Sequence, residues 1–161
     1  MKRCAVLIQT LPTPDSMALI GKCRELFEEV QELKNADDIA LVLDGKPLEL
    51  VVVDLLDPGD LRSICLRLQQ EQPGTKVVTL TDCYLGTKHF YAMNRAGAHG
   101  ICLKSSSSVV LSEAISRVLA GEHYCDPELD ALINQGMKPG IEEFKLSKDD
   151  VQVLIRSEER R

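Results

Sequence analysis

The chain has 161 residues, 44% of them hydrophobic, and a formal net charge of -6 at pH 7. Its length suits one domain with a real core and a tail, and its negative charge argues against strong binding of nucleic acid. No apolar stretch is long enough to span a membrane, and the apolar run after Arg3 is too short for a secretory signal. A cytoplasmic protein with no membrane partner is therefore expected.

Six cysteines are spread along the chain without the spacing of a redox motif. No disulfide framework is expected in a chain that lacks a secretory signal. Cys4, Cys65 and Cys102 stand among apolar neighbours and are predicted to be small buried residues in a reducing cytosol. Cys83 follows a predicted strand, where an exposed thiol would be open to oxidation. The cysteines and histidines match no zinc-ligand pattern, so they predict no metal site.

Strands and helices alternate along most of the chain. Apolar runs bounded by turn residues predict strands at residues 4–9, 29–33, 48–54, 76–81 and 99–104. Apolar residues at helical spacing predict helices at residues 16–26, 35–44, 60–70, 87–96 and 109–120. In the first helix one apolar stripe is expected to face the core: Met17, Ile20, Cys23 and Leu26.

This alternation predicts a parallel sheet with helices on both faces, built from right-handed crossovers. The fold class is therefore α/β, a doubly wound five-stranded parallel sheet of the flavodoxin or CheY type with strand order 2-1-3-4-5. The carboxyl ends of four strands would then share one edge of the sheet: Gln9 and Thr10, Asp54, Thr81, and Lys104.

Asp54 is the most informative residue, because it ends an apolar strand and is followed by the turn residues Pro58 and Gly59. Open α/β sheets bind ligands in the crevice beyond the carboxyl ends of their strands, so the position suits a chemically active carboxylate. Aspartate also caps helices, and the sequence leaves open whether Asp54 does that instead. The four serines of residues 105–108 are expected to cap the following helix, since no glycine-rich phosphate loop accompanies them.

The strand-end residues carry a resemblance to a known family, the receiver domains of response regulators. Residues 49–59 resemble the phosphoacceptor strand of that family without gaps, and residues 95–104 are similar to its segment RAGAxGYLLK. Asp54, Thr81 and Lys104 match its phosphoacceptor, its switch threonine and its phosphate-contacting lysine. The resemblance implies phosphoryl transfer to Asp54, with Mg²⁺ neutralising the phosphoryl oxygens.

The end of the chain resembles the NarL/LuxR-type transcriptional regulators of this family. Residues 146–154 are similar to the first helix of their DNA-binding domain. The resemblance implies three parts: a receiver-like domain at residues 1–122, a short helix and linker at 123–145, and the truncated start of a helix-turn-helix domain at 146–161. It also implies a homodimer, a histidine kinase or other regulator as partner, and DNA bound through the missing part of the last domain.

The metal site of the family is degenerate in this sequence. Response regulators have two adjacent acids at the end of the first strand, where this chain has Gln9 and Thr10. Mg²⁺ needs carboxylates beside a phosphoryl dianion, and neutral oxygens do not replace them. Asp15 and Asp57 are the acids that stand near enough in sequence to be substitute metal ligands. The aromatic switch residue is missing too, since Ile101 stands at its position.

The sequence therefore predicts an atypical receiver, or pseudo-receiver, that is not an enzyme and needs no cofactor. It would control transcription through dimerisation or partner binding, without standard Mg²⁺-dependent phosphorylation, and Asp54 and Lys104 would form a direct ion pair. Two alternatives stay open. One is a working phosphoreceiver that binds Mg²⁺ with the help of Asp15, and the other is a redox or small-molecule sensor at the same edge of the sheet, with Cys83 as the thiol.

Overall fold

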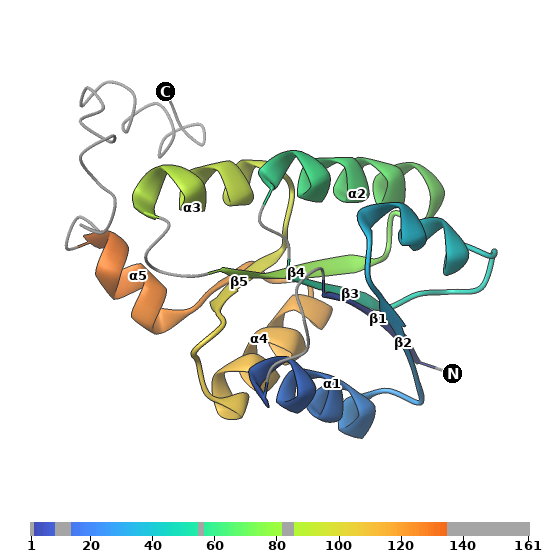
Figure 1. Cartoon of the computed structure of the whole chain (residues 1–161), viewed down its shortest axis with the longest axis horizontal. Helices are drawn as coiled ribbons and strands as arrows, with labels where there is room; N and C mark the ends of the chain where they lie inside the picture. The colour runs from blue at the N-terminus through green and yellow to red at the C-terminus, as the bar shows by residue number, and fades with distance from the viewer. Residues whose placement is uncertain (1, 9–13, 55–56, 82–85, 135–161) are drawn as a thin grey trace.

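The computed structural model describes residues 2–8, 14–54, 57–81 and 86–134. Strands and helices alternate along them (Figure 1), in the order β1 (Arg3–Ile8), α1 (Pro14–Leu26), β2 (Glu29–Leu33), the 3-10 helix η1 (Ala36–Leu41), β3 (Leu50–Asp54), α2 (Pro58–Glu71), β4 (Lys76–Thr81), α3 (Gly86–Arg95), β5 (Gly100–Leu103), α4 (Ser108–Leu119), β6 (Tyr124–Cys125) and α5 (Pro127–Asn134). Among these residues, no helix is both long and apolar enough to cross a lipid bilayer.

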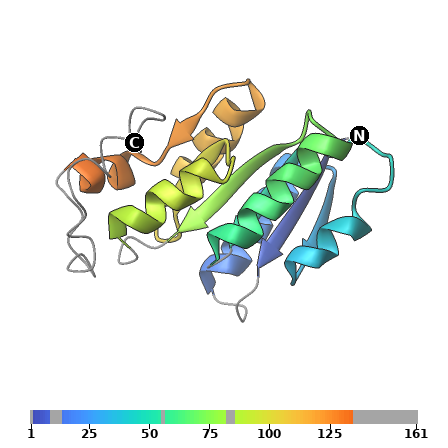
Figure 2. The same ribbon diagram turned by 90° about the horizontal axis from the view of Figure 1, so that it is seen from above.

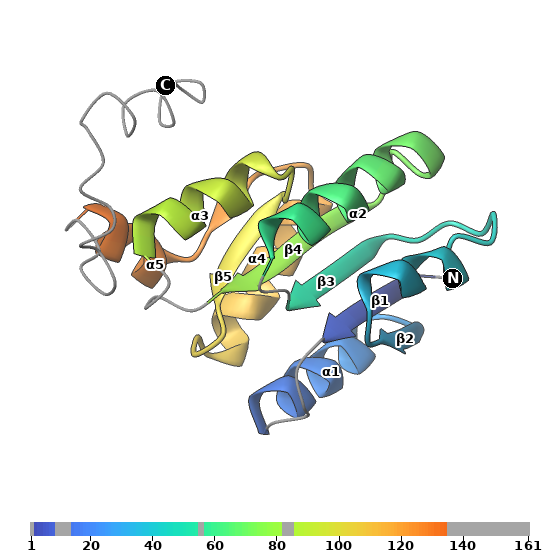
Figure 3. The same ribbon diagram turned by 45° about the horizontal axis from the view of Figure 1, so that its top comes forward.

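The described strands form one parallel sheet with the order β2-β1-β3-β4-β5-β6. Figure 3 shows the arrowheads of β1, β3 and β4 pointing the same way, so that their carboxyl ends share one edge. The predicted fold class and the order of the first five strands are confirmed. The predicted count of five strands is wrong, because β6 pairs with β5 and places Tyr124 opposite Gly100. A two-residue strand is too short to show the alternation that identifies strands in a sequence.

Helices cover both faces of the sheet, as the apolar strands require. Figures 1 and 2 show α2 and α3 side by side over one face, with α1 and α4 on the other. Side chains alternate along each strand, so β3 contributes to two cores. Val51 and Val53 pack with Leu61 and Ile64 of α2, whereas Val52 packs in the cluster formed by α1 and α4.

Two of the predicted helices differ from the structure. In α1, Met17 and Leu26 are exposed while Leu19 and Cys23 are buried, so the predicted apolar stripe is only partly right. Residues three apart along an α-helix are separated by about 300°, which is about 60° short of a full turn. Four residues at this spacing therefore spread over about half of the helix circumference, so they cannot all face the core. The helix predicted from residue 35 forms only the short η1, which buries Ile39 and leaves Leu41 exposed.

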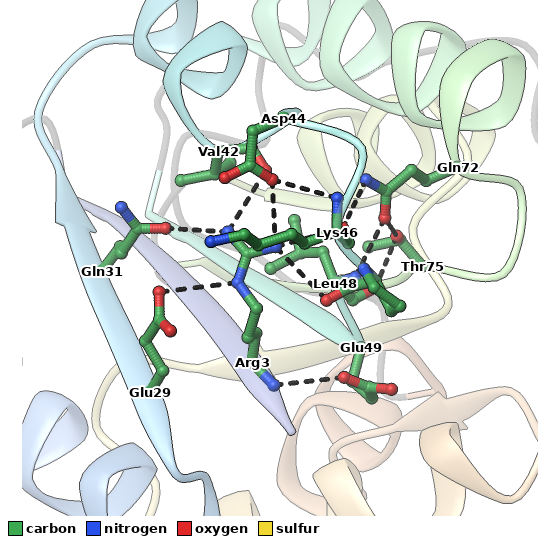
Figure 4. Close-up of polar contacts among 11 residues, drawn as sticks. Arg3, Glu29, Gln31, Val42, Asp44, Lys46, Leu48, Glu49, Gln72 and Thr75 are labelled. Atoms are coloured by element: carbon green, nitrogen blue, oxygen red, sulfur yellow. Dashed lines mark hydrogen bonds and ion pairs between the residues drawn. The ribbon is translucent and has the colours of Figure 1, made fainter. Parts of the chain in front are cut away.

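The buried Arg3 links the amino ends of β1 and β2 to the loop before β3 (Figure 4). Asp54 lies at the opposite edge of the sheet, because it ends β3. Arg3 Nη1 donates to the carbonyl oxygen of Lys46 at 3.1 Å and lies 3.3 Å from Asp44 Oδ1. Its Nη2 donates to Gln31 Oε1 at 3.1 Å. The backbone N–H of Lys46, together with the Arg3 charge, lowers the pKa of Asp44. The cluster ties the loop before β3 to β1 and β2.

The segment 123–145, where a short helix was expected, contains α5. Leu129 of α5 is completely buried in the core on the α2–α3 side of the sheet. Together, β6 and α5 therefore add the first part of the segment 123–145 to the folded domain. The division at residue 122 stays a prediction, and residues 135–161, with the start of the helix-turn-helix domain expected there, lie outside the described residues.

Candidate functional site

Asp54 and Lys104 form the centre of the candidate site. Asp54 ends β3 on the α1–α4 side of the sheet, in step with Leu50 and Val52. The Nζ atom of Lys104, the first residue after β5, lies 2.9 Å from Asp54 Oδ1. The two side chains are 8% and 24% exposed, respectively, so this ion pair is more shielded from water than an ordinary surface pair. The direct contact expected from the sequence is present.

The capping role that the sequence left open for Asp54 belongs to Asp57. The Oδ1 atom of Asp57 accepts a hydrogen bond from the backbone N–H of Gly59 at 2.8 Å, at the start of α2. Asp57 is exposed, and one of its carboxylate oxygens is engaged in this cap. Asp54 is thereby free of the helix terminus and faces Lys104 instead.

Thr81 ends the neighbouring strand β4 and is buried. The backbone N–H of Lys104 donates to the carbonyl oxygen of Thr81 at 2.9 Å, which fixes the two strand ends side by side. Side chains alternate along a strand, so Thr81 points to the same face of the sheet as Val77, which packs toward α2 and α3. Asp54 points to the opposite face. The Thr81 hydroxyl has no hydrogen-bond partner among the described residues.

A cavity of about 310 Å³ opens beside the ion pair, between α1 and α4. Ser16 and Lys22 of α1 line one wall, and the serines of residues 105–108 line the other. Ser107 caps α4, since its hydroxyl oxygen accepts from the backbone N–H of Val110 at 3.4 Å, as predicted for this serine run. The cavity therefore has a mixed lining, in which five serine hydroxyls, one buried carboxylate and two lysines stand among leucine and other apolar side chains.

The loop that carries Lys104 is held by the buried carboxylate of Asp126, a role that was not predicted from the sequence. Asp126 Oδ2 accepts from the backbone N–H of Leu103 at 3.0 Å and from the hydroxyl of Ser106. Its Oδ1 accepts from the backbone N–H of Glu128 at 2.9 Å, at the start of α5. The Asp-Pro-Glu sequence signals a helix start, but only the fold brings Asp126 to the loop after β5.

The remaining predicted site residues are divided between core and undescribed segments. Ile101, at the position of the aromatic switch, is buried in the α2–α3-side core. Gln9, Thr10, Cys83 and the side chain of Asp15 lie outside the described residues. Within the described residues, no three histidine, cysteine, aspartate or glutamate side chains gather in a way that could hold a metal ion.

The described cysteines are free thiols. Burial raises the pKa of Cys65 to about 11 and that of Cys125 to about 12. Burial and the nearby Asp126 charge raise the pKa of Cys102 to about 12. These three thiols therefore stay protonated and unreactive near neutral pH.

Comparisons with known proteins point to one kind of domain. No model of a protein family matches the chain. The response regulator VraR of Staphylococcus aureus is 27% identical over 119 residues, which cover 73% of this chain and 56% of VraR. The chain thus spans about half the length of the curated relatives it matches.

Solved structures with a similar fold also come from response regulators. A LuxR-family DNA-binding response regulator from Silicibacter pomeroyi superposes with a TM-score of 0.57 at 22% identity, over 78% of this chain and 98% of that one. The isolated receiver domain of RcsB from Salmonella enterica serovar Typhimurium gives a TM-score of 0.62 at 18% identity, over 81% and 96% of the two chains. RcsB bound as two dimers to DNA gives 0.66 at 16% identity, over 96% and 75%.

The parallel sheet, the strand-end residues Asp54, Thr81 and Lys104, and these relatives all lead to the same conclusion. The resemblance to receiver domains stated from the sequence is confirmed for the fold: the described part of the chain has the fold of a response-regulator receiver domain.

Proposed function

We propose that the chain carries the receiver-like domain of a LuxR-type transcriptional regulator that works without standard Mg²⁺-dependent phosphorylation of Asp54. The Asp54–Lys104 ion pair is the observation that carries this proposal. The Lys104 ammonium offsets the charge of Asp54, and the neutral residues Gln9 and Thr10 follow β1 where two further acids would be needed. A Mg²⁺ ion would compete with the Lys104 ammonium for the Asp54 carboxylate, and residues 9 and 10 supply no negative charge to compensate the repulsion.

In this proposal the domain is a regulator rather than an enzyme, and its output is contact with a second copy or another protein. The family resemblance offers two helices as a contact face, the ones at residues 87–96 and at residues 109–120. Figure 1 shows α3 and α4 on opposite faces of the sheet, and β6 with α5 occupies the sheet edge between them. We therefore place the contact on α4, whose first turn exposes Val109. DNA binding belongs to the region beyond the described residues.

Incubation with acetyl phosphate and Mg²⁺, followed by intact-protein mass spectrometry, tests the phosphorylation part of the proposal. We expect no phosphoryl adduct on the unmodified chain. An adduct that disappears in Asp54→Ala but persists in the matched variant Asp130→Ala would establish the working phosphoreceiver instead. Asp130 is the suitable control because it is an exposed acid on α5, lines no part of the cavity beside the ion pair, and is not one of the candidate metal ligands.

The cavity beside the ion pair favours a second candidate function, the sensing of a small polar molecule. Its 310 Å³ lies at the small end of the range typical of ligand sites, and its serine hydroxyls and lysines supply hydrogen-bond donors. A thermal-shift screen of polar metabolites tests this function. A ligand that stabilises the protein but not the Lys22→Gln variant would support it, and the absence of any stabilising compound would count against it.

A further inference from the structure

A second cavity lies near the opposite edge of the sheet, on the α2–α3 face. It has a volume of about 340 Å³ and runs between α2 and the turn that joins α3 to β5. Gly97 allows this turn to approach α2: its φ is +112°, and a Cβ atom there would lie 3.2 Å from Cys65 Cβ. The turn therefore holds the end of α3 close against the side of α2, and we call the space between them the α2–α3 groove.

The α2–α3 groove is rich in cations and free of acids. Arg62 and Arg95 line it, and no aspartate or glutamate is found among its described lining residues. Neither guanidinium forms an ion pair or a hydrogen bond with a described residue. The other described arginines all pair with acids: Arg3, Arg24, Arg67 and Arg117. In a chain of net charge -6, the two described arginines that pair with no described acid thus stand at one cavity.

His99 adds a hydrogen-bond donor to the same lining. Its Nδ1 accepts a hydrogen bond from the backbone N–H of Val77 at 3.1 Å, so the neutral ring carries its proton on Nε2. The ring stacks on His123, with centroids 5.9 Å apart. Burial, then the charge of Lys76 and the proximity of His123, lower the pKa of His99. The ring is therefore neutral near pH 7, in surroundings that are already positive.

We propose that the α2–α3 groove binds a small phosphate-bearing molecule, held by Arg62, Arg95 and the Nε2–H of His99. Guanidinium groups form paired hydrogen bonds with phosphate oxygens, and a phosphate dianion matches the charge of two arginines. The volume suits inorganic phosphate or a mononucleotide rather than a dinucleotide. Neither Asp54 nor Lys104 takes part, so the inference is independent of the proposed function.

Titration with inorganic phosphate, monitored by NMR at an ionic strength held constant with chloride, tests the proposal. We expect saturable shifts of resonances lining the α2–α3 groove and a rise in the pKa of His99, because a bound anion stabilises the imidazolium. Arg62→Gln and Arg95→Gln should each weaken binding about tenfold or more, since each removes a charge-assisted contact. Arg67→Gln is the matched control on α2, because Arg67 pairs with Glu71 outside the α2–α3 groove.

A parallel titration with adenosine monophosphate distinguishes the two sources of phosphate. Tighter binding of the nucleotide than of phosphate, with the same dependence on Arg62 and Arg95, would identify a phosphate ester as the ligand class. Equal or weaker binding of the nucleotide would identify inorganic phosphate. If neither compound gives saturable shifts, or if Arg67→Gln weakens binding as much as the arginines of the α2–α3 groove do, the proposal is wrong.

Discussion

Replacing Asp126 with alanine removes the carboxylate that joins the Lys104 loop to α5. The backbone N–H of Leu103, now bonded to Asp126 Oδ2, would be left buried without a partner, which costs about 1–3 kcal/mol. Loss of the hydrogen bond from Glu128 N–H removes a helix cap worth about 1 kcal/mol. Release of the buried charge offsets part of this cost. The free energy of unfolding should therefore fall by about 2–3 kcal/mol.

Urea unfolding followed by circular dichroism measures this loss directly. Hydrogen–deuterium exchange shows where it acts, and we expect faster exchange in residues 103–108 and in α5 but not in β1 or β2. Asp130→Ala is the matched control, because Asp130 is an exposed acid on the same helix and its loss should change stability by less than about 0.5 kcal/mol. Equal stability losses in the two variants, or unchanged exchange after β5, would refute the reasoning.

Three further substitutions test other parts of the fold. Arg3→Met should lower the free energy of unfolding, measured by urea unfolding, by about 3 kcal/mol, because it leaves the hydrogen-bond acceptors around Arg3 unpaired. Arg24→Met, which breaks an exposed ion pair, should lower it by less than about 1 kcal/mol. His99 has a folded pKa below its ordinary value of 6.5, so the unfolded chain binds more protons and stability should fall as pH drops below 6.5. His99→Gln should flatten that part of a stability–pH profile, and an unchanged profile would contradict the assignment. Gly97→Ala should cost about 1–3 kcal/mol because of its positive φ and close contact, while Gly74→Ala, with open space around it, should be nearly neutral in thermal unfolding.

The parallel sheet, and the edge of it that carries Asp54 and Lys104, could be predicted because each strand is recognisable from its own short stretch of sequence. An apolar strand ending in Asp54 and the glycine-bounded strand before Lys104 identify buried parallel strands, and parallel strands necessarily gather their carboxyl ends. The strand order followed from the commonest arrangement of five such units. The contact between Asp54 and Lys104 was expected for the same reason, since both stand at the ends of strands on one edge.

The features that were missed depend on contacts between distant residues. Asp126 signals a helix start in the sequence, but its bonds to Leu103 and Ser106 exist only because β6 extends the sheet. Arg62 and Arg95 are ordinary surface residues in the sequence, and only the close approach at Gly97 brings them to one cavity. The buried side of α1 was misjudged because an apolar spacing of three leaves the face of a helix ambiguous.

A gain-of-function variant tests the charge argument behind the proposed function. Ile8, the last residue of β1, is the register partner of Asp54, and positions 9 and 10 follow it directly. The double substitution Gln9→Asp and Thr10→Asp would supply the two carboxylates that Mg²⁺ needs, so that the ion no longer depends on the carboxylate paired with Lys104. We expect the variant to acquire a phosphoryl group from acetyl phosphate, seen by intact mass, only when Mg²⁺ is present and Asp54 is intact.

The neutral variant Gln9→Asn and Thr10→Asn serves as the matched control, since it alters the same positions without adding charge. It should remain unmodified, as should the chain with its own Gln9 and Thr10. Failure of the acidic variant to react, despite an unchanged unfolding transition, would mean that missing charge is not what keeps Asp54 unreactive. Three features would survive the substitution: the pairing of Asp54 with Lys104, the loop held by Asp126, and Ile101 in place of the aromatic switch residue. One of these would then be what separates this domain from phosphorylated receivers.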